Sequence, residues 1–426
     1  EDLLQKARDQ LDRREPQGYW KSPRKLGPIF STAMILERLS AYQQVIEGRE
    51  KKDATPQPPQ PLPTFSTGDR KKALKSLERG ATFLLTAVDE EGRFGFAGNP
   101  DPGITAMAVG ALLAVPEPRP EEVRKAIDGG LDWLVSLQLR DGSIHMGQLA
   151  NYVTSASILA LTAAGREGDE EVVARARRFL QALQADEAEG YGLHDRFYGG
   201  VGYGGDERPD LSNLQMALDA LHAAKVPSDD PTFQKALTFL QRCQNRSESN
   251  SGVLTQGNVT IRAGDDGGAG YAPGESKAGY VELPDGTKVP RSYGSMTYAL
   301  LKGFLLAGLE KDDARVEAAW KWLCANYTLD INPGFDTSSD PRAPYQGLYY
   351  YFYTMAKALD LYGDEVVVDT AGMEHPWRID LVGRITSLQR QDGSWINANA
   401  QRWYEGNPVL ATAYAMLTLG NALPAE

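Results

Sequence analysis

The hydrophobic positions of the chain follow two alternating patterns. In the first, apolar residues recur at three- and four-residue spacing with charged residues between them, as at Val123, Ile127, Leu131 and Leu134. This spacing predicts an amphipathic helix with one buried stripe. In the second, as over residues 152–164, almost no residue is charged. Because such a helix has no side suited to water, we expect it to be surrounded by other helices.

A glycine-containing turn links the two kinds of helix. It has the form Gln-x-x-Asp-Gly-Ser at 138–143 and again at 389–394, where Trp395 follows. Asp-Gly pairs end helices and reverse the chain. The offset from the turn glycine to the hydroxyl residue that opens the next helix is nearly constant, at about 13 residues from Gly142 to Ser155. The pattern therefore indicates an internal repeat.

Seven helix pairs can be placed along the chain. The amphipathic members are expected near residues 2–14, 70–88, 121–138, 170–184, 231–243, 313–327 and 376–389, and the apolar members near 29–47, 102–115, 151–164, 210–224, 293–308, 346–361 and 408–421. The fold class predicted is all-α: an α/α toroid, or barrel, of about six to seven hairpins with apolar inner helices and amphipathic outer helices. An open solenoid is the alternative, and closure is favoured because it buries the inner layer better.

Two stretches interrupt the repeat within the single domain expected over residues 1–426. Residues 51–64 are rich in proline and predict an extended connector. Residues 252–291 form a glycine-rich insertion before the fifth inner helix. Loops of that length in compact domains usually serve function or are disordered, so we expect a lid or a rim.

Composition limits the possible partners. The chain has 57 acidic and 45 basic residues, a formal charge of -12 and no basic face, so nucleic acid is excluded as a partner. No apolar stretch reaches the roughly 18–20 residues of a membrane span. A soluble protein is expected. Because the sequence opens at Glu1 without a methionine, an export signal that was removed and a trimmed chain are equally good explanations, and localisation and protein partners stay open.

Cys243 and Cys324 are interpreted as two buried free thiols rather than one disulfide.

The turn at 389–395 and its looser copies resemble the repeat turn of squalene-hopene cyclases and protein prenyltransferase β-subunits, over nearly the whole chain. The resemblance implies a terpene cyclase-like toroid whose inner helices line a central cavity for a hydrophobic, isoprenoid ligand. Fold does not fix function, so it does not by itself imply an activity.

The catalytic motifs of that superfamily are degenerate in this chain. Class II cyclases open one inner helix with Asp-x-Asp-Asp-Thr-Ala, whose middle Asp protonates an alkene, a step that needs a strong acid. The frame at 101–106 has Gly103 at the donor position, and the frame at 210–215 has Ser212. Neither residue can protonate an alkene. Asp101 and Asp210 are therefore interpreted first as acidic residues at helix N-termini.

A prenyltransferase-type zinc site is not predicted either. Those enzymes hold zinc with an Asp, a Cys and a His. By rough matching, Tyr293 stands at the Cys position of this chain and Tyr351 at the His position. No metal and no other cofactor is therefore expected.

The candidate site residues are tyrosines of the inner helices and acidic residues of the loops before them. The predicted ligand-binding residues share an aromatic ring that can face the cavity; they are Tyr152, Tyr293, Tyr298, Tyr349, Tyr350, Tyr351 and Tyr353. The alternative, that these rings merely fill the centre, has equal weight. The predicted catalytic residues are Asp210, Asp265 and Asp266, as acids or bases at the mouth of the cavity. Their alternative role is that of solvated turn residues.

The leading functional hypothesis is a toroid that binds a hydrophobic, isoprenoid ligand in its centre. Whether it is an enzyme is left open; an enzyme would be of the terpene cyclase type, an isomerase or a lyase. Two alternatives remain. One is a carbohydrate-active α/α toroid, which needs an open groove with paired carboxylates. The other is a non-catalytic scaffold that binds protein through its rim.

Overall fold

The computed structural model describes residues 62–96, 98–204 and 208–424. From Pro63 onward these residues belong to one unit, which extends to Glu426. The first predicted helix pair, at 2–14 and 29–47, and most of the predicted connector lie outside the described residues. The seventh hairpin and the single domain over residues 1–426 therefore stay predictions.

Twelve α-helices alternate between two layers in the described part of the chain. The amphipathic set comprises α3 (Thr67–Leu85), α5 (Glu121–Ser136), α7 (Glu170–Ala182), α9 (Pro231–Cys243), α11 (Ala314–Ala325) and α13 (Trp377–Ser387). The apolar set comprises α4 (Pro102–Leu113), α6 (Ala150–Ala164), α8 (Leu211–Ala223), α10 (Gly294–Leu306), α12 (Leu348–Tyr362) and α14 (Pro408–Ala422). The predicted helices in this part of the chain are confirmed, with small shifts at their ends.

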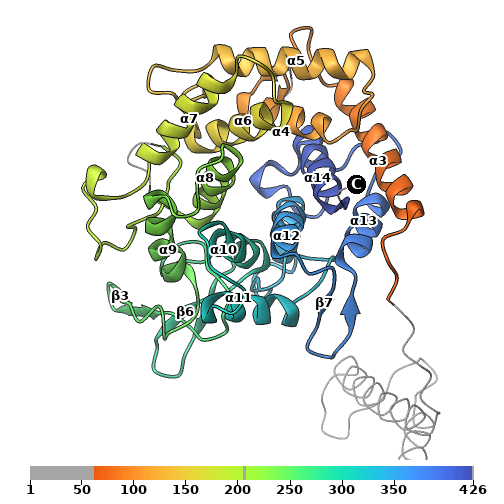
Figure 1. The fold of residues 1–426 in the computed structure, drawn as a ribbon. Coiled ribbons are helices and arrows are strands. Elements are labelled where there is room, and N and C mark those ends of the chain that lie inside the picture. Colours follow the sequence, from red (N-terminus) through yellow and green to blue (C-terminus); the bar gives the residue numbers. More distant parts are fainter. Residues whose placement is uncertain (1–61, 97, 205–207, 425–426) are drawn as a thin grey trace, which may run out of the picture. The chain divides into compact units, whose positions relative to one another are not determined.

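The apolar helices contact one another in a cyclic order. Each of α4, α6, α8, α10, α12 and α14 packs against the next, and α14 packs against α4. Figure 1 shows these six helices inside, which we call the inner ring, and α3, α5, α7, α9, α11 and α13 around them. In the outer layer, α3 contacts both α5 and α13.

The burial of the two sets follows their sequence patterns. In α5 the buried residues form one stripe, with Val123, Ile127 and Leu131 among them. In α10 every residue except Leu305 is buried. A helix that is apolar on all sides is stable only between other helices, so the second pattern places α10 in the inner ring.

Repeat glutamines tie neighbouring outer helices together. The Gln389 amide donates to the carbonyl oxygen of Gly393, in its own turn, and to that of Ser76 in α3, both at 2.9 Å. Three other glutamines donate in the same way to a turn glycine and to the next outer helix: Gln138 to Gly142 and Val172, Gln184 to Gly199 and Thr232, and Gln244 to Gly267 and Arg315.

The turn glycines are required by backbone conformation and by close approach. Gly393 has φ +88°, and a Cβ on it would lie 2.3 Å from the carbonyl oxygen of Arg79. Gly142 has φ +96°, and its Cβ would lie 2.3 Å from the carbonyl oxygen of Arg175. A residue with a side chain fits neither the dihedral angle nor the space.

A threonine of the following inner helix completes several of the turns. The Phe94 backbone N–H donates to Thr105 Oγ1, and the Ile144 N–H donates to Thr154 Oγ1, both at 2.9 Å. The residue predicted at this position of the third unit, Ser155, instead donates to Asn151 Oδ1. In the third unit the hydroxyl that completes the turn is thus that of Thr154, one residue before the residue used to measure the offset.

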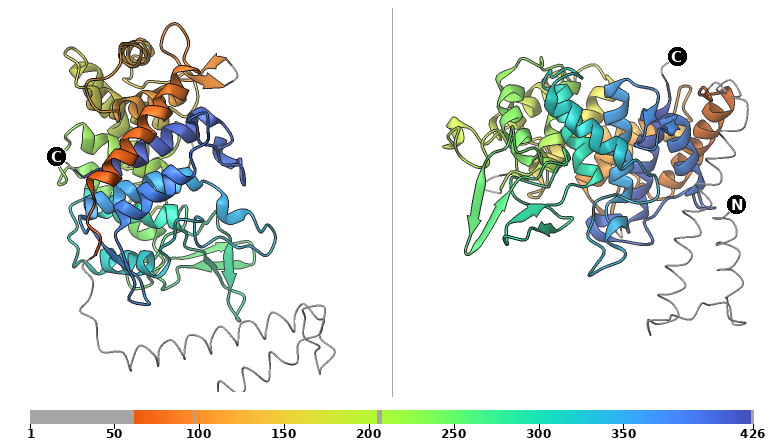
Figure 2. Two further views of the ribbon diagram at one scale, coloured as in Figure 1. Left: turned by 90° about the vertical axis from the view of Figure 1, so that its right-hand side faces the viewer. Right: turned by 90° about the horizontal axis from the view of Figure 1, so that it is seen from below.

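The insertion contains a small sheet, so the chain is mostly helical rather than strictly all-α as predicted. Its strands are β3 (Val253–Gln256), β4 (Val259–Arg262), β5 (Tyr280–Glu282) and β6 (Lys288–Pro290), in the order β3-β4-β6-β5. The β4–β6 pair is parallel and the others are antiparallel. Figure 2 shows these strands protruding on one side of the helices. An Asp285-Gly286 turn joins β5 to β6, a turn typical of hairpins.

The remaining elements are short. They are the strand pairs β1 (Gly95–Phe96) with β2 (Asn99–Pro100) and β7 (Val367–Val368) with β8 (Glu374–His375), and the 3-10 helices η1 (Glu187–Glu189), η2 (Ala343–Tyr345) and η3 (Arg402–Tyr404). Cys243 and Cys324 are both free; Cys243 is buried as expected, whereas Cys324 is only half-buried. Within the described part of the chain, no helix has the length and apolar character that a membrane crossing requires.

Candidate functional site

Three side chains from different helices meet in the middle of the inner ring. The Ser212 hydroxyl on α8 shares one hydrogen bond with the Tyr152 hydroxyl on α6 and another, of 2.8 Å, with the Tyr350 hydroxyl on α12. Helices α6 and α12 stand opposite each other in the cyclic order of contacts. Only side chains that point to the centre can connect them, so Tyr152 and Tyr350 face the middle of the ring.

Open space reaches these tyrosines. Tyr152, Tyr350 and Tyr414 are only half-buried, although the helices that carry them are otherwise largely buried. The Tyr414 ring of α14 meets the Tyr350 ring edge-on, with 6.0 Å between the ring centroids. A side chain retains accessible surface only where a water molecule fits beside it. The centre of the ring is therefore not filled completely by these rings.

Charged groups continue the network along the ring. The Gln215 amide donates to the Tyr350 hydroxyl at 2.8 Å, and its carbonyl oxygen accepts a hydrogen bond from the Lys302 ammonium. Lys302 Nζ lies 2.5 Å from Asp219 Oδ2, and Lys357 Nζ lies 2.9 Å from the same oxygen. Helices α8, α10 and α12 thus bring one carboxylate and two amines together inside the ring.

Burial and neighbouring charge shift the pKa values of these three groups. Burial lowers the pKa of Lys302 to about 8, against the opposing effect of Asp219. Burial also acts to lower the pKa of Lys357, but the Asp219 carboxylate outweighs it and the pKa is raised. For Asp219, burial acts to raise the pKa, and the two ammonium groups outweigh it and lower the pKa. The shifts of Lys357 and Asp219 thus favour their charged forms, whereas burial moves the pKa of Lys302 toward neutral pH.

Asp210 lies at the N-terminus of α8, as the helix-capping interpretation predicts. Its carboxylate accepts hydrogen bonds of 2.8 Å from the Asn213 backbone N–H, the Asn213 amide and the Tyr271 hydroxyl. Tyr271 comes from the glycine-rich insertion, which therefore touches this end of the ring. Burial raises the pKa of Asp210 despite these bonds. Asp101 caps α4 in the same way, through the N–H of Ile104.

Asp265 and Asp266 lie in the turn after β4, and neither contacts Asp210. Asp266 Oδ1 accepts from the Gly268 N–H at 3.0 Å and from the Ser292 hydroxyl at 2.7 Å. Asp392 makes the equivalent bonds to the N–H and hydroxyl of Ser394 in its repeat turn. Asp265 is exposed and accepts from the Ser247 N–H. The contacts of both residues are those of turn residues, and their catalytic roles stay predictions.

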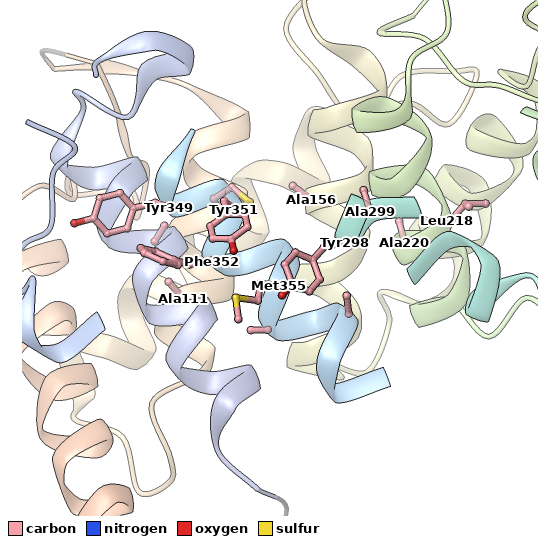
Figure 3. Close-up of a cluster of buried hydrophobic side chains, with 14 of the residues drawn as sticks. Ala111, Ala156, Leu218, Ala220, Tyr298, Ala299, Tyr349, Tyr351, Phe352 and Met355 are labelled. Atoms are coloured by element: carbon pink, nitrogen blue, oxygen red, sulfur yellow. The ribbon is translucent and has the colours of Figure 1, made fainter. Parts of the chain in front are cut away.

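The predicted tyrosines divide into two groups. Tyr353 lies beside the central lysine, with its hydroxyl 3.5 Å from Lys357 Nζ, and so joins Tyr152 and Tyr350 at the centre. The others are buried in contact with other parts of the structure. Figure 3 shows Tyr298 beside Tyr351, with 5.8 Å between the ring centroids. Tyr351 donates to the carbonyl oxygen of Thr328.

Tyr349 and Tyr293 belong to the second group. The Tyr349 hydroxyl reaches the carbonyl oxygen of Ile396, in the loop after α13. Tyr293 precedes α10, and its ring meets that of Phe335 at 5.1 Å. A helix that is aromatic on all sides, as α12 is at its start, must direct some rings outward. Tyr293, Tyr298, Tyr349 and Tyr351 are thus packed against surrounding elements rather than at the centre, and their predicted role in ligand binding stays a prediction.

Glu405 is a buried acid that the sequence pattern did not identify. It lies in the loop before α14, is 1% exposed, and accepts from the Asn397 amide at 2.7 Å and from the Tyr350 N–H at 2.8 Å. Burial raises its pKa to about 7, against the lowering effect of these hydrogen bonds. Its carboxyl group lies at the N-terminus of α12, next to the tyrosine that faces the centre.

The central charges were also missed, although a signal for them exists. Asp219, Lys302 and Lys357 interrupt helices that are otherwise apolar. An ionisable residue in a helix with no water-facing side needs a buried partner of opposite charge. Opposite charges in neighbouring inner helices suggest which residues form such a pair. Glu405 has no comparable signal, because it stands in an irregular loop.

A cleft of about 730 Å³ lies at the rim, between the loop after α3 and the loop before α14. Two aromatic rings in its lining, those of Phe96 and Tyr404, lie with their centroids 5.3 Å apart. The polar side chains of Gln401 and Asn407 also line it.

No family model matches the chain, and no curated protein matches it. Solved structures do. A variant of the type II terpene cyclase MstE from Scytonema, in complex with its substrate geranylgeranyl dihydroxybenzoate, matches with a TM-score of 0.50 and 15% identity, over 84% of this chain and 99% of that chain. A second variant of MstE, without ligand, matches with a TM-score of 0.50 and 15% identity, over 83% and 98%. The fold is similar to that of a type II terpene cyclase. At this identity the likeness concerns the fold alone.

The two residues that the sequence resemblance set at the donor position lie in inner helices. The Ser212 hydroxyl on α8 points to the middle of the ring, where it meets Tyr152 and Tyr350. Gly103 on α4 has no side chain. The correspondence of these positions to a proton donor stays a prediction.

Proposed function

We propose that the described helices form a closed α/α toroid that binds an apolar, isoprenoid-like ligand at its centre. The cyclic contacts of the inner ring support closure. The fold similarity to MstE, a cyclase solved with a geranylgeranyl substrate, supports the ligand class.

The observation that carries this proposal is the meeting of Tyr152, Ser212 and Tyr350. These side chains come from three helices, and the two tyrosines are only half-buried. Ligand sites of this kind are lined mainly by apolar and aromatic side chains, with a few polar groups that fix orientation. Leu159 follows Tyr152 by seven residues, which places it on the same face of α6 and adds an aliphatic wall.

The activity proposed is binding rather than protonation of an alkene. A hydroxyl at Ser212 cannot supply a strong acid. Burial raises the pKa of two of the three predicted acids, Asp210 and Asp266, and of these two Asp210 lies two residues from Ser212. However, its carboxylate already accepts three hydrogen bonds, which favour the ionised form.

Calorimetric titration with geranylgeraniol and with squalene tests the proposal. The wild-type protein is expected to bind at least one of them with micromolar affinity. Leu159→Trp, which fills the centre, should weaken binding by tenfold or more, whereas Leu139→Trp, at an exposed turn, should not. Absence of binding to the folded wild-type protein, or equal effects of the two substitutions, would contradict it.

A second candidate function is carbohydrate binding at the rim cleft. The Phe96 and Tyr404 rings, with amide side chains beside them, are the groups that stack on and hydrogen-bond to sugars. Depletion of the protein from solution by insoluble polysaccharides tests this candidate. Tyr404→Ala should abolish depletion, and retention of depletion by that variant would reject the cleft as the site.

A further inference from the structure

The charged cluster in the inner ring has an unequal number of positive and negative groups. Lys302 and Lys357 both contact Asp219, and the side chains are 1%, 19% and 5% exposed, respectively. Among the residues that the structure describes, Asp219 is the one carboxylate within ion-pair distance of either amine. With all three groups ionised, the cluster carries one net positive charge.

The other partners of the amines are neutral. Lys302 donates to the Gln215 carbonyl oxygen. Lys357 Nζ lies 3.5 Å from the Tyr353 hydroxyl and 5.4 Å from the centroid of the Tyr353 ring, which is the distance of a cation–π contact. Neutral oxygens and ring faces stabilise an ammonium group without cancelling its charge. A buried charge without a counter-charge is costly, and a bound anion removes that cost.

Lys357 is the member of the cluster that a ligand can reach. It is the most exposed of the three, and it follows Tyr350 by seven residues, which places both on the face of α12 that points to the centre. Lys302 is almost fully buried, and its ammonium group contacts Gln215 and Asp219. An anion beside Lys357 Nζ would thus lie on the same side of α12 as the space next to Tyr350 and Tyr152.

We propose that Lys357, supported by Lys302, binds the carboxylate of an acid with a long hydrocarbon chain, whose apolar part occupies the space beside Tyr350 and Tyr152. This proposal rests on the ligand-binding function proposed above and assigns the head group. A monoanion balances the single excess charge. A phosphate or diphosphate would bring two or more negative charges next to Asp219, and the second would have no cation to balance it.

The test compares an acid with its alcohol. Geranylgeranoic acid and geranylgeraniol are titrated into the wild-type protein and into Lys357→Met. The wild type should bind the acid at least tenfold more tightly than the alcohol. Lys357→Met should lose that preference while its affinity for the alcohol stays within about threefold. Palmitic acid is a third ligand: binding as tight as that of geranylgeranoic acid would keep the carboxylate site and remove the isoprenoid specificity.

The control is Lys311→Met. Lys311 also pairs with one aspartate, Asp364 at 2.7 Å, and lies over a tyrosine ring, that of Tyr362, but it is exposed. This variant should keep the wild-type preference. Lys302→Met removes the excess charge from the enclosed side and should also abolish the preference, which tests the proposal if Lys357→Met does not fold.

The outcomes separate the two proposals. If the wild type binds acid and alcohol equally, or if Lys357→Met keeps the preference for the acid, the head-group site is wrong and the apolar site stands. If the folded wild type binds neither geranylgeranoic acid nor the alcohol, both proposals are wrong.

Discussion

The Gln389 amide, just after α13, donates a hydrogen bond of 2.9 Å to the carbonyl oxygen of Ser76 in α3, 313 residues earlier in the chain. The same amide nitrogen donates to Gly393 in the repeat turn. Its carbonyl oxygen accepts from the Arg79 guanidinium at 3.0 Å. One side chain therefore links the last outer helix, the last repeat turn and the first outer helix of the described unit.

Replacing this glutamine should weaken the unit measurably. Gln389→Leu removes both donors and leaves the carbonyl oxygens of Ser76 and Gly393 without a partner in a half-buried place, so we expect a loss of about 1–3 kcal/mol in the free energy of unfolding. Urea unfolding followed by circular dichroism measures it. Gln391→Leu, an exposed neighbour, is the control and should change stability by less than about 0.5 kcal/mol.

Two glycines ten residues apart should respond to alanine with opposite signs. Gly393 has φ +88°, and its Cβ would meet a backbone oxygen at 2.3 Å, so Gly393→Ala should destabilise by at least about 1–2 kcal/mol. Gly383 lies inside α13 with no atom within 4 Å of its Cβ position, so Gly383→Ala should stabilise by about 0.5–1 kcal/mol. Thermal unfolding measures the change in stability of each variant. If both variants are destabilised, or both are stabilised, the conformational argument is contradicted.

The helices of the described unit could be predicted because their physical cause is local. A stripe of apolar residues in α5 and the absence of charges in α6 depend only on nearby positions, and both helices occur where predicted. The turns were found for the same reason, since Asp-Gly ends a helix wherever it stands. The sheet of the insertion was missed because its strands are three or four residues long and pair across a loop, which leaves almost no periodic signal.

The candidate site could be predicted only in part, because it depends on direction. Spacing along α12 shows that five aromatics surround the helix but not which of them faces the centre, and Tyr350 does while Tyr351 does not. The lysines are a different case. Lys302, Lys357 and Asp219 all lie in helices predicted to be inner, which was a signal of burial that the sequence analysis did not use. The pairing of both lysines with Asp219 depends on the order of the helices around the ring.

The stability of the protein should depend on pH through Glu405. Its pKa is raised from 4.5 to about 7 by burial, so the folded state holds the proton more tightly than the unfolded chain. The resulting stabilisation is fully present below pH 4.5 and is lost as the pH rises through about 7. Between about pH 5 and about pH 8, the wild type should lose roughly 2–3 kcal/mol relative to Glu405→Gln.

Urea unfolding at the two pH values measures this difference. Glutamine keeps an acceptor for the Tyr350 N–H, so the substitution removes the titration with little change in shape. Glu374→Gln, at an exposed position, serves as the control and should follow the wild type at both pH values. If the stability of Glu405→Gln depends on pH in the same way as that of the wild type, the carboxyl group of Glu405 does not cause the pH dependence.

The central cluster should respond very differently to the loss of its negative and its positive members. Asp219→Asn leaves two ammonium groups close together without a counter-charge and should cost about 3–5 kcal/mol. Lys302→Met leaves Asp219 paired one to one with Lys357 and should cost less than about 2 kcal/mol. In the double variant a single ammonium group remains, so it should be more stable than Asp219→Asn alone.

A double-mutant cycle from urea unfolding gives the three values. In the wild type the attraction of both amines to Asp219 compensates the like-charge repulsion between Lys302 and Lys357, and in Asp219→Asn nothing compensates it. The costs of the two substitutions should therefore not add. Additive costs, or equal costs for Asp219→Asn and Lys302→Met, would mean that one of the amines is neutral in the folded protein. The cluster would then have no excess charge to offer a ligand, and the carboxylate site at Lys357 would lose its physical basis.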